Sequence, residues 1–318
     1  MTVIFAMQNY RRTSCIFRAT LVLLLILAPL IEGQNATLKI LYTGNLNAAL
    51  DDCRCGGDLV GGLTRIATEI EKYRRKYPNL LLLDAGDYLN SYPDPSLNLL
   101  FLKFLQKMNY TALNLGDQEF VEGPEFLAQY FSTHPNPPKM ISSNIHPARV
   151  KPFFAAKIAA KSANDARVLI WGFTSPRAFD FIPPRHLRFT SVDKFLVGLP
   201  ESVRRSPDLK IVLFHGKWSA AEVMAKKFSF LNIIIIAHNQ HRRAEIVGRT
   251  LLAEPGMEGE YLGLITAVRE NRNWKLENKF IPIRKTVPEN PAFQKRVQRF
   301  YKTTRNQKIT SKRQSQSP

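Results

Sequence analysis

The chain has 318 residues, of which 45% are hydrophobic and 22% are charged, and its formal net charge at pH 7 is +19. This length and composition are typical of a globular protein with one large or two small domains, and they exclude a chain that is disordered throughout. Much of the positive charge lies toward the C-terminus, without the aromatic interleaving of a nucleic-acid-binding module, so no specific nucleic-acid partner is expected.

The first residues have the layout of a signal peptide. Three arginines, the last of them Arg18, precede the apolar run Leu21–Ile31, which is too short to span a bilayer comfortably. No clear cleavage site follows this run. We therefore expect residues 1–33 to be a signal peptide or an uncleaved N-terminal anchor, and the protein to be exported to the periplasm or the extracellular space.

From residue 34 onward, strand-like and helix-like patterns alternate. Short apolar runs bounded by turn residues predict strands, and apolar residues at helical spacing predict helices. The elements predicted in the first half are strand 38–42, helix 63–77, strand 80–83, helix 97–108, strand 112–115, a short helix from 124 and a strand near 140–142.

The second half repeats this alternation and then becomes all β. The predicted elements are strand 167–173, helix 192–203, strand 211–214, helix 220–228, strands 233–237, 245–252, 264–268 and 274–282, and a helix over 291–301. We expect one layered α/β domain over 34–288 with helices outside the sheets, a C-terminal helix over 289–302 and a disordered basic tail over 303–318. Such a tail can contact anionic surfaces.

Five of the predicted strands run directly into residues that can hold a metal ion or its water. Ligands in open α/β sheets collect outside the carboxyl ends of the strands, so these residues are expected to converge in space. They are Asn45 and Asn47 after 38–42, Asp84 and Asp87 after 80–83, Asp117 after 112–115, His215 after 211–214, and His238, Gln240 and His241 after 233–237.

Two cysteines, Cys53 and Cys55, follow the first of these strand ends. A disulfide between residues two apart is strained and therefore reducible. The thiols can also ligate a metal or undergo redox chemistry, and a pair of inert loop cysteines is the plain alternative. We expect them at the rim of the same pocket, where they can bind a protein partner.

The order of these motifs resembles the calcineurin-like metallophosphoesterases, and more closely their 5′-nucleotidase branch. A small subgroup of exported relatives with a Cys-x-Cys pair after the first motif is the most similar. The resemblance implies a four-layer α/β/β/α sandwich over about residues 37–285. It rests on the motifs at 42–47, 61–65, 84–87, 116–119, 142–144, 215–216, 237–240 and 254–263.

The chain departs from that family at several metal positions. The family's first motif is Asp-x-His, where this chain has Asn45 and Asn47, and the second His of its last motif falls on Gln240. His241 can replace that ligand only if the loop is one residue longer. The bridging Asp is retained as Asp87, which is also a candidate catalytic residue, and the family's Asn–His pair becomes Asp117 and Gln118.

These departures affect the two metal positions of the family unequally. The first site loses its carboxylate and both histidines, whereas the second keeps three ligands and gains a carboxylate in place of an amide. The resemblance therefore implies one divalent ion, zinc, manganese or iron, rather than two, with Asp87, Asp117, His215 and His238 as ligands. The alternative is a site that has decayed, with these side chains bonded only to one another.

Two functional hypotheses follow. The first is a weak phosphoester hydrolase of nucleotidase type that acts on a small phosphate ester. Gln118 stands where the family has its general-acid His, and it cannot give a proton to the leaving group, so a slow reaction is expected. The second is a non-catalytic metal-binding or thiol-redox accessory protein that meets its partner through Cys53 and Cys55.

Overall fold

The structure is a computed structural model, which describes residues 37–51, 57–161, 166–180, 183 and 186–315. Ala36–Pro318 form one compact unit. Within the described residues, no helix is both long and apolar enough to cross a bilayer.

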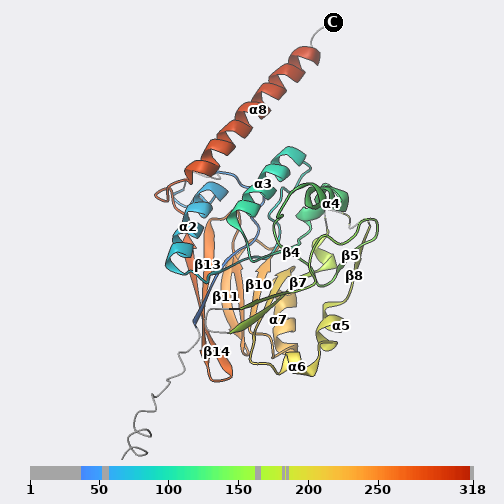
Figure 1. The fold of residues 1–318 in the computed structure, drawn as a ribbon, viewed down its shortest axis with the longest axis vertical. Helices are drawn as coiled ribbons and strands as arrows, with labels where there is room; N and C mark the ends of the chain where they lie inside the picture. Colours follow the sequence, from blue (N-terminus) through green and yellow to red (C-terminus); the bar gives the residue numbers. More distant parts are fainter. Residues whose placement is uncertain (1–36, 52–56, 162–165, 181–182, 184–185, 316–318) are drawn as a thin grey trace, which may run out of the picture. The chain divides into compact units, whose positions relative to one another are not determined.

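Two six-stranded sheets form the centre of this unit (Figure 1). The first has the order β14-β13-β1-β2-β3-β4, in which β1 to β4 are parallel and β13 and β14 are antiparallel additions. Its strands are β1 (Thr37–Thr43), β2 (Leu81–Asp84), β3 (Ala112–Asn114), β4 (Met140–Ile141), β13 (Tyr261–Glu270) and β14 (Asn273–Pro282).

The second sheet has the order β11-β12-β10-β9-β7-β6, with a parallel centre and one antiparallel strand at each edge. Its strands are β6 (Ile158–Lys161), β7 (Arg167–Thr174), β9 (Leu209–His215), β10 (Ile233–Ala237), β11 (Arg242–Val247) and β12 (Thr250–Pro255). A separate small ribbon pairs β5 (Ile145–Pro147) with β8 (Leu187–Phe189).

The side chains of each central strand alternate between two cores, as the two-residue period of a strand requires. Ile40 and Tyr42 of β1 pack against the second sheet, whereas Leu41 packs against the helices. In β10, Ile233 and Ile235 face the first sheet, and Ile234 and Ile236 face the outer helix layer. The central strands of both sheets are therefore buried on both faces, which explains their uninterrupted apolar runs.

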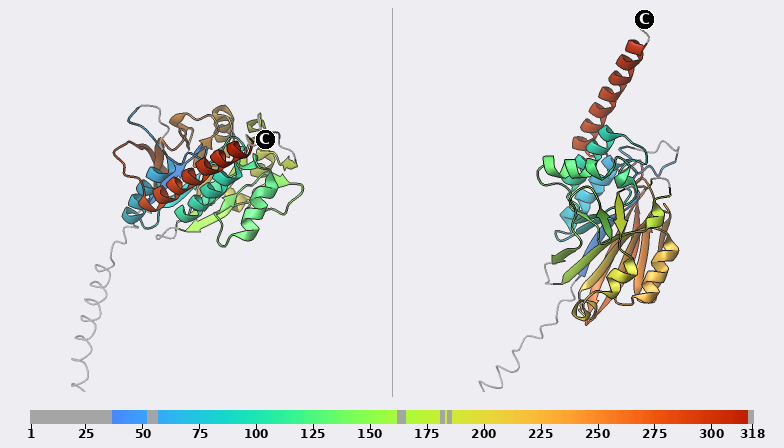
Figure 2. Two further views of the ribbon diagram at one scale, coloured as in Figure 1. Left: turned by 90° about the horizontal axis from the view of Figure 1, so that it is seen from above. Right: turned by 90° about the vertical axis from the view of Figure 1, so that its right-hand side faces the viewer.

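The helices form the two outer layers. Those covering the first sheet are α2 (Leu63–Lys76), α3 (Pro95–Met108) and α4 (Pro124–Thr133), and those covering the second are α5 (Val192–Val197) and α7 (Trp218–Lys227). The last helix, α8 (Pro291–Ser315), lies over α2 and α3 at its start (Figure 2). Phe293 of α8 stacks there on Phe104 of α3, with ring centroids 4.5 Å apart. The result is an α/β/β/α arrangement.

Several predicted elements differ from those observed. The helix predicted over 192–203 is two short helices, α5 and α6 (Glu201–Arg204), because Gly198 and Pro200 interrupt it. The strand predicted over 245–252 is wrong, since Gly248, with φ 64°, makes a turn there between β11 and β12. The short strands β5, β6 and β8 were not predicted.

The C-terminal end of the chain also differs from its prediction. Helix α8 continues to Ser315, whereas the sequence predicted a helix to 302 and a disordered tail over 303–318. No Gly or Pro lies between 303 and 315, and Lys, Arg and Gln are good helix formers, so nothing in the local sequence ends the helix earlier.

Candidate metal site

Four potential metal ligands meet at the carboxyl ends of four parallel strands. Asp87 follows β2, Asp117 follows β3, His215 is the last residue of β9 and His238 follows β10. Each offers one ligand atom, and these atoms all lie within 4.8 Å of one another. Three of the four residues are buried, and His238 is half-buried, so the group is accessible from one side.

The ligand atoms are close enough together to surround a single small cation, and two of them, His215 Nε2 and Asp117 Oδ1, are at hydrogen-bond distance. The Nε2 atom of His215 lies 2.9 Å from Asp117 Oδ1 and 3.3 Å from Asp87 Oδ1, and His238 Nδ1 lies 3.7 Å from Asp117 Oδ1. Ligands around a tetrahedral ion bound at 2.0–2.2 Å are separated by roughly 3.3–3.6 Å. Two carboxylates and two neutral imidazoles also supply the charge that balances a divalent ion.

The backbone around the group is strained. Asp87 and His238 have φ angles of 59° and 106°, and Asn45 between them has 52°, all in the left-handed region that costs non-glycine residues energy. Gly116 must be small, because a Cβ there would collide with Asp87 Oδ1. Strain of this kind persists where surrounding contacts enforce it, and here it directs two candidate ligands inward.

Glu119 enforces part of this geometry, and the sequence analysis assigned it no role. Its buried carboxylate accepts hydrogen bonds from the backbone N–H groups of Asp87 at 3.0 Å, Tyr88 at 2.9 Å, Leu89 at 3.1 Å and Gly116 at 2.6 Å. The side chain therefore ties the loop after β2 to the loop after β3. Its place directly after Asp117 and Gln118 was the only available sequence signal.

The carboxyl groups of the site interact strongly. Burial raises the pKa of Asp87 well above its ordinary value, and the nearby Asp117 raises it further. Burial acts in the same direction on Asp117, but the hydrogen bond with His215 and the nearby His238 outweigh it and lower the pKa of Asp117. Burial also raises the pKa of Asp84 to about 6, although Thr43 and Gly86 donate hydrogen bonds to it. A cation would stabilise these charges.

Asn45 is fully engaged in bonds to the protein. Its side-chain N–H₂ donates to the Gly256 carbonyl at 2.9 Å, and its side-chain oxygen accepts from the backbone N–H of His238 at 2.7 Å. The residue has no exposed surface. In this arrangement the amide positions His238, and neither of its polar atoms is free to bind a metal ion.

The buried side-chain oxygens of two other amides have no hydrogen-bond partner in the described part of the protein. Asn47 Oδ1 and Gln118 Oε1 are both buried without a hydrogen-bond partner there, while the backbone N–H of Gln118 donates to Asp87 Oδ1 at 3.2 Å. A buried acceptor without a partner costs about 1–3 kcal/mol. A bound ion with its water, or a bound polar group, would supply the missing donors.

The remaining candidates do not join the four-residue group. Gln240 and His241 are exposed, and the backbone N–H of His241 donates to buried Glu254 at 3.2 Å. Cys53 and Cys55 lie outside the described residues, so their position relative to Asp87 stays a prediction.

The chain is similar in sequence to known 5′-nucleotidases. No protein-family model matches the chain. It is 34% identical over 129 residues to the snake venom 5′-nucleotidase of Crotalus adamanteus, a match that covers 37% of this chain and 21% of that protein. It is 27% identical over 227 residues to the 5′-nucleotidase of Bos taurus, covering 64% of this chain and 38% of that protein. The chain thus matches less than two thirds of either relative's length.

Solved structures agree with the predicted fold. The 5′-nucleotidase precursor from Thermus thermophilus superposes with a TM-score of 0.73 at 18% identity, covering 85% of this chain and 59% of that one. The calcineurin-like phosphoesterase YfkN from Bacillus subtilis gives a TM-score of 0.68 at 19% identity, covering 85% and 98%. The chain is therefore homologous to 5′-nucleotidases and has the calcineurin-like phosphoesterase fold, which confirms the resemblance to that branch and the predicted α/β/β/α sandwich. The narrower resemblance to exported relatives with a Cys-x-Cys pair stays a prediction.

Proposed function

We propose that this relative of the 5′-nucleotidases binds one divalent transition-metal ion through Asp87, Asp117, His215 and His238. The observation that carries the proposal is the convergence of four potential ligand atoms, all within 4.8 Å of one another, at the carboxyl ends of four strands. Zinc, manganese and iron are the ions that accept such a mixed nitrogen and oxygen set.

The substrate class proposed for this site is a small phosphate ester. A divalent ion there would polarise a phosphoryl oxygen or lower the pKa of a bound water. The homology to nucleotide-hydrolysing enzymes supports this choice of substrate. Asn45 is occupied with Gly256 and His238, so a second ion lacks its ligands.

Hydrolysis is proposed to be slow. Gln118 lies beside Asp87 but has no proton to give to a leaving group, and general-acid help ordinarily contributes about 10²–10⁴-fold in rate. The same observation favours a second candidate function, in which the protein binds a metal ion, or uses a thiol pair, without catalysing hydrolysis.

Elemental analysis of the purified full chain tests the first proposal. About one equivalent of metal is expected, and it should be lost when His215 and His238 are both replaced by alanine. Replacement of His146, an exposed histidine away from the group, is the matched control and should leave the metal content unchanged. Two equivalents, or retention of metal by the double variant, would overturn the proposal.

A hydrolysis assay separates the two candidate functions. With AMP as substrate, the metal-loaded chain is expected to show a slow turnover, below the ordinary enzyme range of about 1–10³ s⁻¹, that a chelator abolishes. Metal binding without any chelator-sensitive hydrolysis of AMP or of bis-p-nitrophenyl phosphate would favour the non-catalytic function instead.

We also propose that the chain is exported. The support is the arginine-flanked apolar run Leu21–Ile31, in the layout of a signal peptide or anchor. Fractionation of expressing cells, followed by N-terminal sequencing, is expected to find the protein outside the cytoplasm. Recovery in the cytoplasm alone would contradict this proposal.

A further inference from the structure

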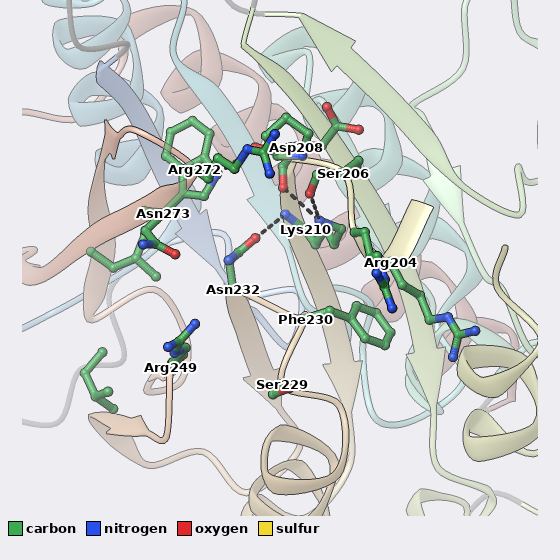
Figure 3. Close-up of a pocket in the computed structure, with 15 residues that line it drawn as sticks. Arg204, Ser206, Asp208, Lys210, Ser229, Phe230, Asn232, Arg249, Arg272 and Asn273 are labelled. Atoms are coloured by element: carbon green, nitrogen blue, oxygen red, sulfur yellow. Dashed lines mark hydrogen bonds between the residues drawn. The ribbon is translucent and has the colours of Figure 1, made fainter. Parts of the chain in front are cut away.

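A cavity separate from the candidate metal site lies at the other end of the second sheet, near the amino ends of β9 and β10 (Figure 3). Its volume is about 570 Å³, within the range of pockets that hold small ligands. Lys210 near the start of β9 lines it, whereas His215 of the metal site ends the same strand. Five residue steps along an extended strand separate the two by roughly 17 Å.

The lining of this cavity carries an excess of positive charge. Arg204 and Arg205 lie at the end of α6, Lys210 on β9, Arg249 in the β11–β12 turn and Arg272 in the β13–β14 turn. Among the described residues that line it, the only acidic one is Asp208, and Arg167 already binds it with two hydrogen bonds, at 3.0 and 2.6 Å. The basic residues come from four separate segments of the chain.

Two of these cations lack an acidic partner. Arg204 and Arg205 share Glu201, whereas no carboxylate of the described residues lies within 4.0 Å of Arg249 or Arg272. Both arginines are exposed at the mouth of the cavity. Guanidinium groups bind phosphate oxygens through paired N–H donors, and two or more of them around one pocket favour a multiply charged anion.

The floor of the cavity contains a buried cation. Lys210 is only 3% exposed, and its ammonium donates to the carbonyl oxygens of Ser206 at 2.6 Å and Asp208 at 3.3 Å. Arg204 Nε is buried and has no hydrogen-bond partner in the described part of the protein. A buried cation held by neutral carbonyls and a buried donor without an acceptor are both costly, and an anion in the cavity would compensate both.

Two aromatic side chains line the cavity beside these charges. Phe230 and Trp274 supply aromatic surface on the lining, and the Trp274 indole N–H donates to the Pro207 carbonyl at 3.2 Å, which fixes its ring. Asn232 accepts a hydrogen bond from the backbone N–H of Lys210 at 2.8 Å and closes the floor (Figure 3). The cavity therefore has a fixed lining beside its basic residues.

We propose that this basic cavity, lined by Arg204, Lys210, Arg249, Arg272 and Trp274, binds a ligand that carries a phosphate or diphosphate group. The ligand is either a free phosphorylated small molecule or the phosphate headgroup of a lipid. The proposal does not depend on the metal site, because none of its residues touches the four candidate ligands.

The test titrates full-length protein with pyrophosphate, in the presence of EDTA, and follows Trp fluorescence and heat of binding. The variant Arg249→Gln with Arg272→Gln is expected to bind at least about tenfold more weakly than the natural chain, since charged hydrogen bonds are lost. The control Arg75→Gln with Lys103→Gln removes the same charge from exposed positions on α2 and α3, and should bind normally.

Two further arms identify the source of the phosphate and separate this site from the metal site. Vesicles of phosphatidylcholine with about 20 mol% phosphatidate should capture the natural chain more than the arginine variant if a lipid headgroup is the ligand. Equal capture with weakened pyrophosphate binding indicates a free phosphate. Equal pyrophosphate affinity in the natural chain and the arginine variant, or loss of binding in His215→Ala with His238→Ala, would overturn the proposal.

Discussion

The side-chain oxygen of Asn45 accepts a hydrogen bond from the backbone N–H of His238 at 2.7 Å. Asn45, which the family resemblance places at a metal-binding position, therefore holds the candidate ligand His238 in place. His238 sits at φ 106°, a conformation that needs such enforcement. The conformation of one candidate metal ligand therefore depends on the side chain of Asn45.

This link predicts that Asn45→Ala destabilises the protein. The change leaves the His238 N–H and the Gly256 carbonyl buried without partners, at a cost of about 1–3 kcal/mol each. We expect the free energy of unfolding to fall by roughly 2–4 kcal/mol, and metal affinity to fall with it, since His238 is released. Urea denaturation and metal titration measure the two effects.

Asn90→Ala is a suitable comparison for that experiment, because Asn90 is less buried and its side chain donates to a nearby exposed carbonyl, that of Tyr92. A small change in unfolding free energy is expected there. If Asn45→Ala behaved like Asn90→Ala in both measurements, the positioning role of Asn45 would be wrong.

Glu119 gives a second prediction. Glu119→Gln replaces a carboxylate that accepts four backbone hydrogen bonds with an amide that has one acceptor oxygen and two competing donors. The loop carrying Asp87 should loosen, and metal affinity should fall about 10–100-fold, the usual effect of losing a residue that orients ligands. Glu125→Gln on exposed α4 is the control. Unchanged affinity in a folded Glu119→Gln protein would contradict this role.

Restoring the related enzymes' residues gives a third prediction. The combined variant Asn45→Asp, Asn47→His, Gln118→His and Gln240→His is expected to bind a second equivalent of metal and to hydrolyse AMP faster, because an acid and a second ion are supplied. Without metal it should be less stable than the natural chain, since a carboxylate at 45 faces the Gly256 carbonyl. Thermal unfolding with and without added manganese, together with the rate, tests both statements.

Much of the site could be predicted from strand ends alone. Parallel strands place their carboxyl ends at one edge of a sheet, so Asp87 had to approach Asp117 on the first sheet, and His215 had to approach His238 on the second. The meeting of the two pairs depends on the packing of the two sheets, which leaves no short-range pattern in the sequence. The sequence did not indicate which amide would bond to which backbone group. The hydrogen bonds of Asn45 and Glu119 depend on loop conformations with positive φ, and such conformations follow from tertiary contacts rather than from local propensity.

The basic cavity was not predicted for a related reason. Arg249 and Arg272 lie in turns, and the turn at Gly248 fell inside a predicted strand. Their approach to Lys210 depends on β12 pairing with β10, and on the two sheets packing face to face. Neither contact leaves a short-range pattern in the sequence, whereas a buried strand does so through its continuous apolar run, as at Ile233 to Ile236.

The last prediction concerns pH and the metal-free protein. Burial raises the pKa of Asp84 to about 6, and burial with the neighbouring Asp87 raises the pKa of Glu119 to about 8. The folded chain therefore holds more protons than the unfolded chain between pH of about 4 and 8, so its stability falls as pH rises through this window. Each pH unit over which the folded chain holds one extra proton costs about 1.4 kcal/mol of stability.

In EDTA, the unfolding temperature should therefore be lower at pH 8 than at pH 5. The substitution Asp84→Asn should flatten the fall in stability below a pH of about 6. Added zinc should restore stability at pH 8, because the cation replaces the protons. An EDTA-treated chain as stable at pH 8 as at pH 5 would show that these buried carboxylates do not carry the strain that a metal relieves.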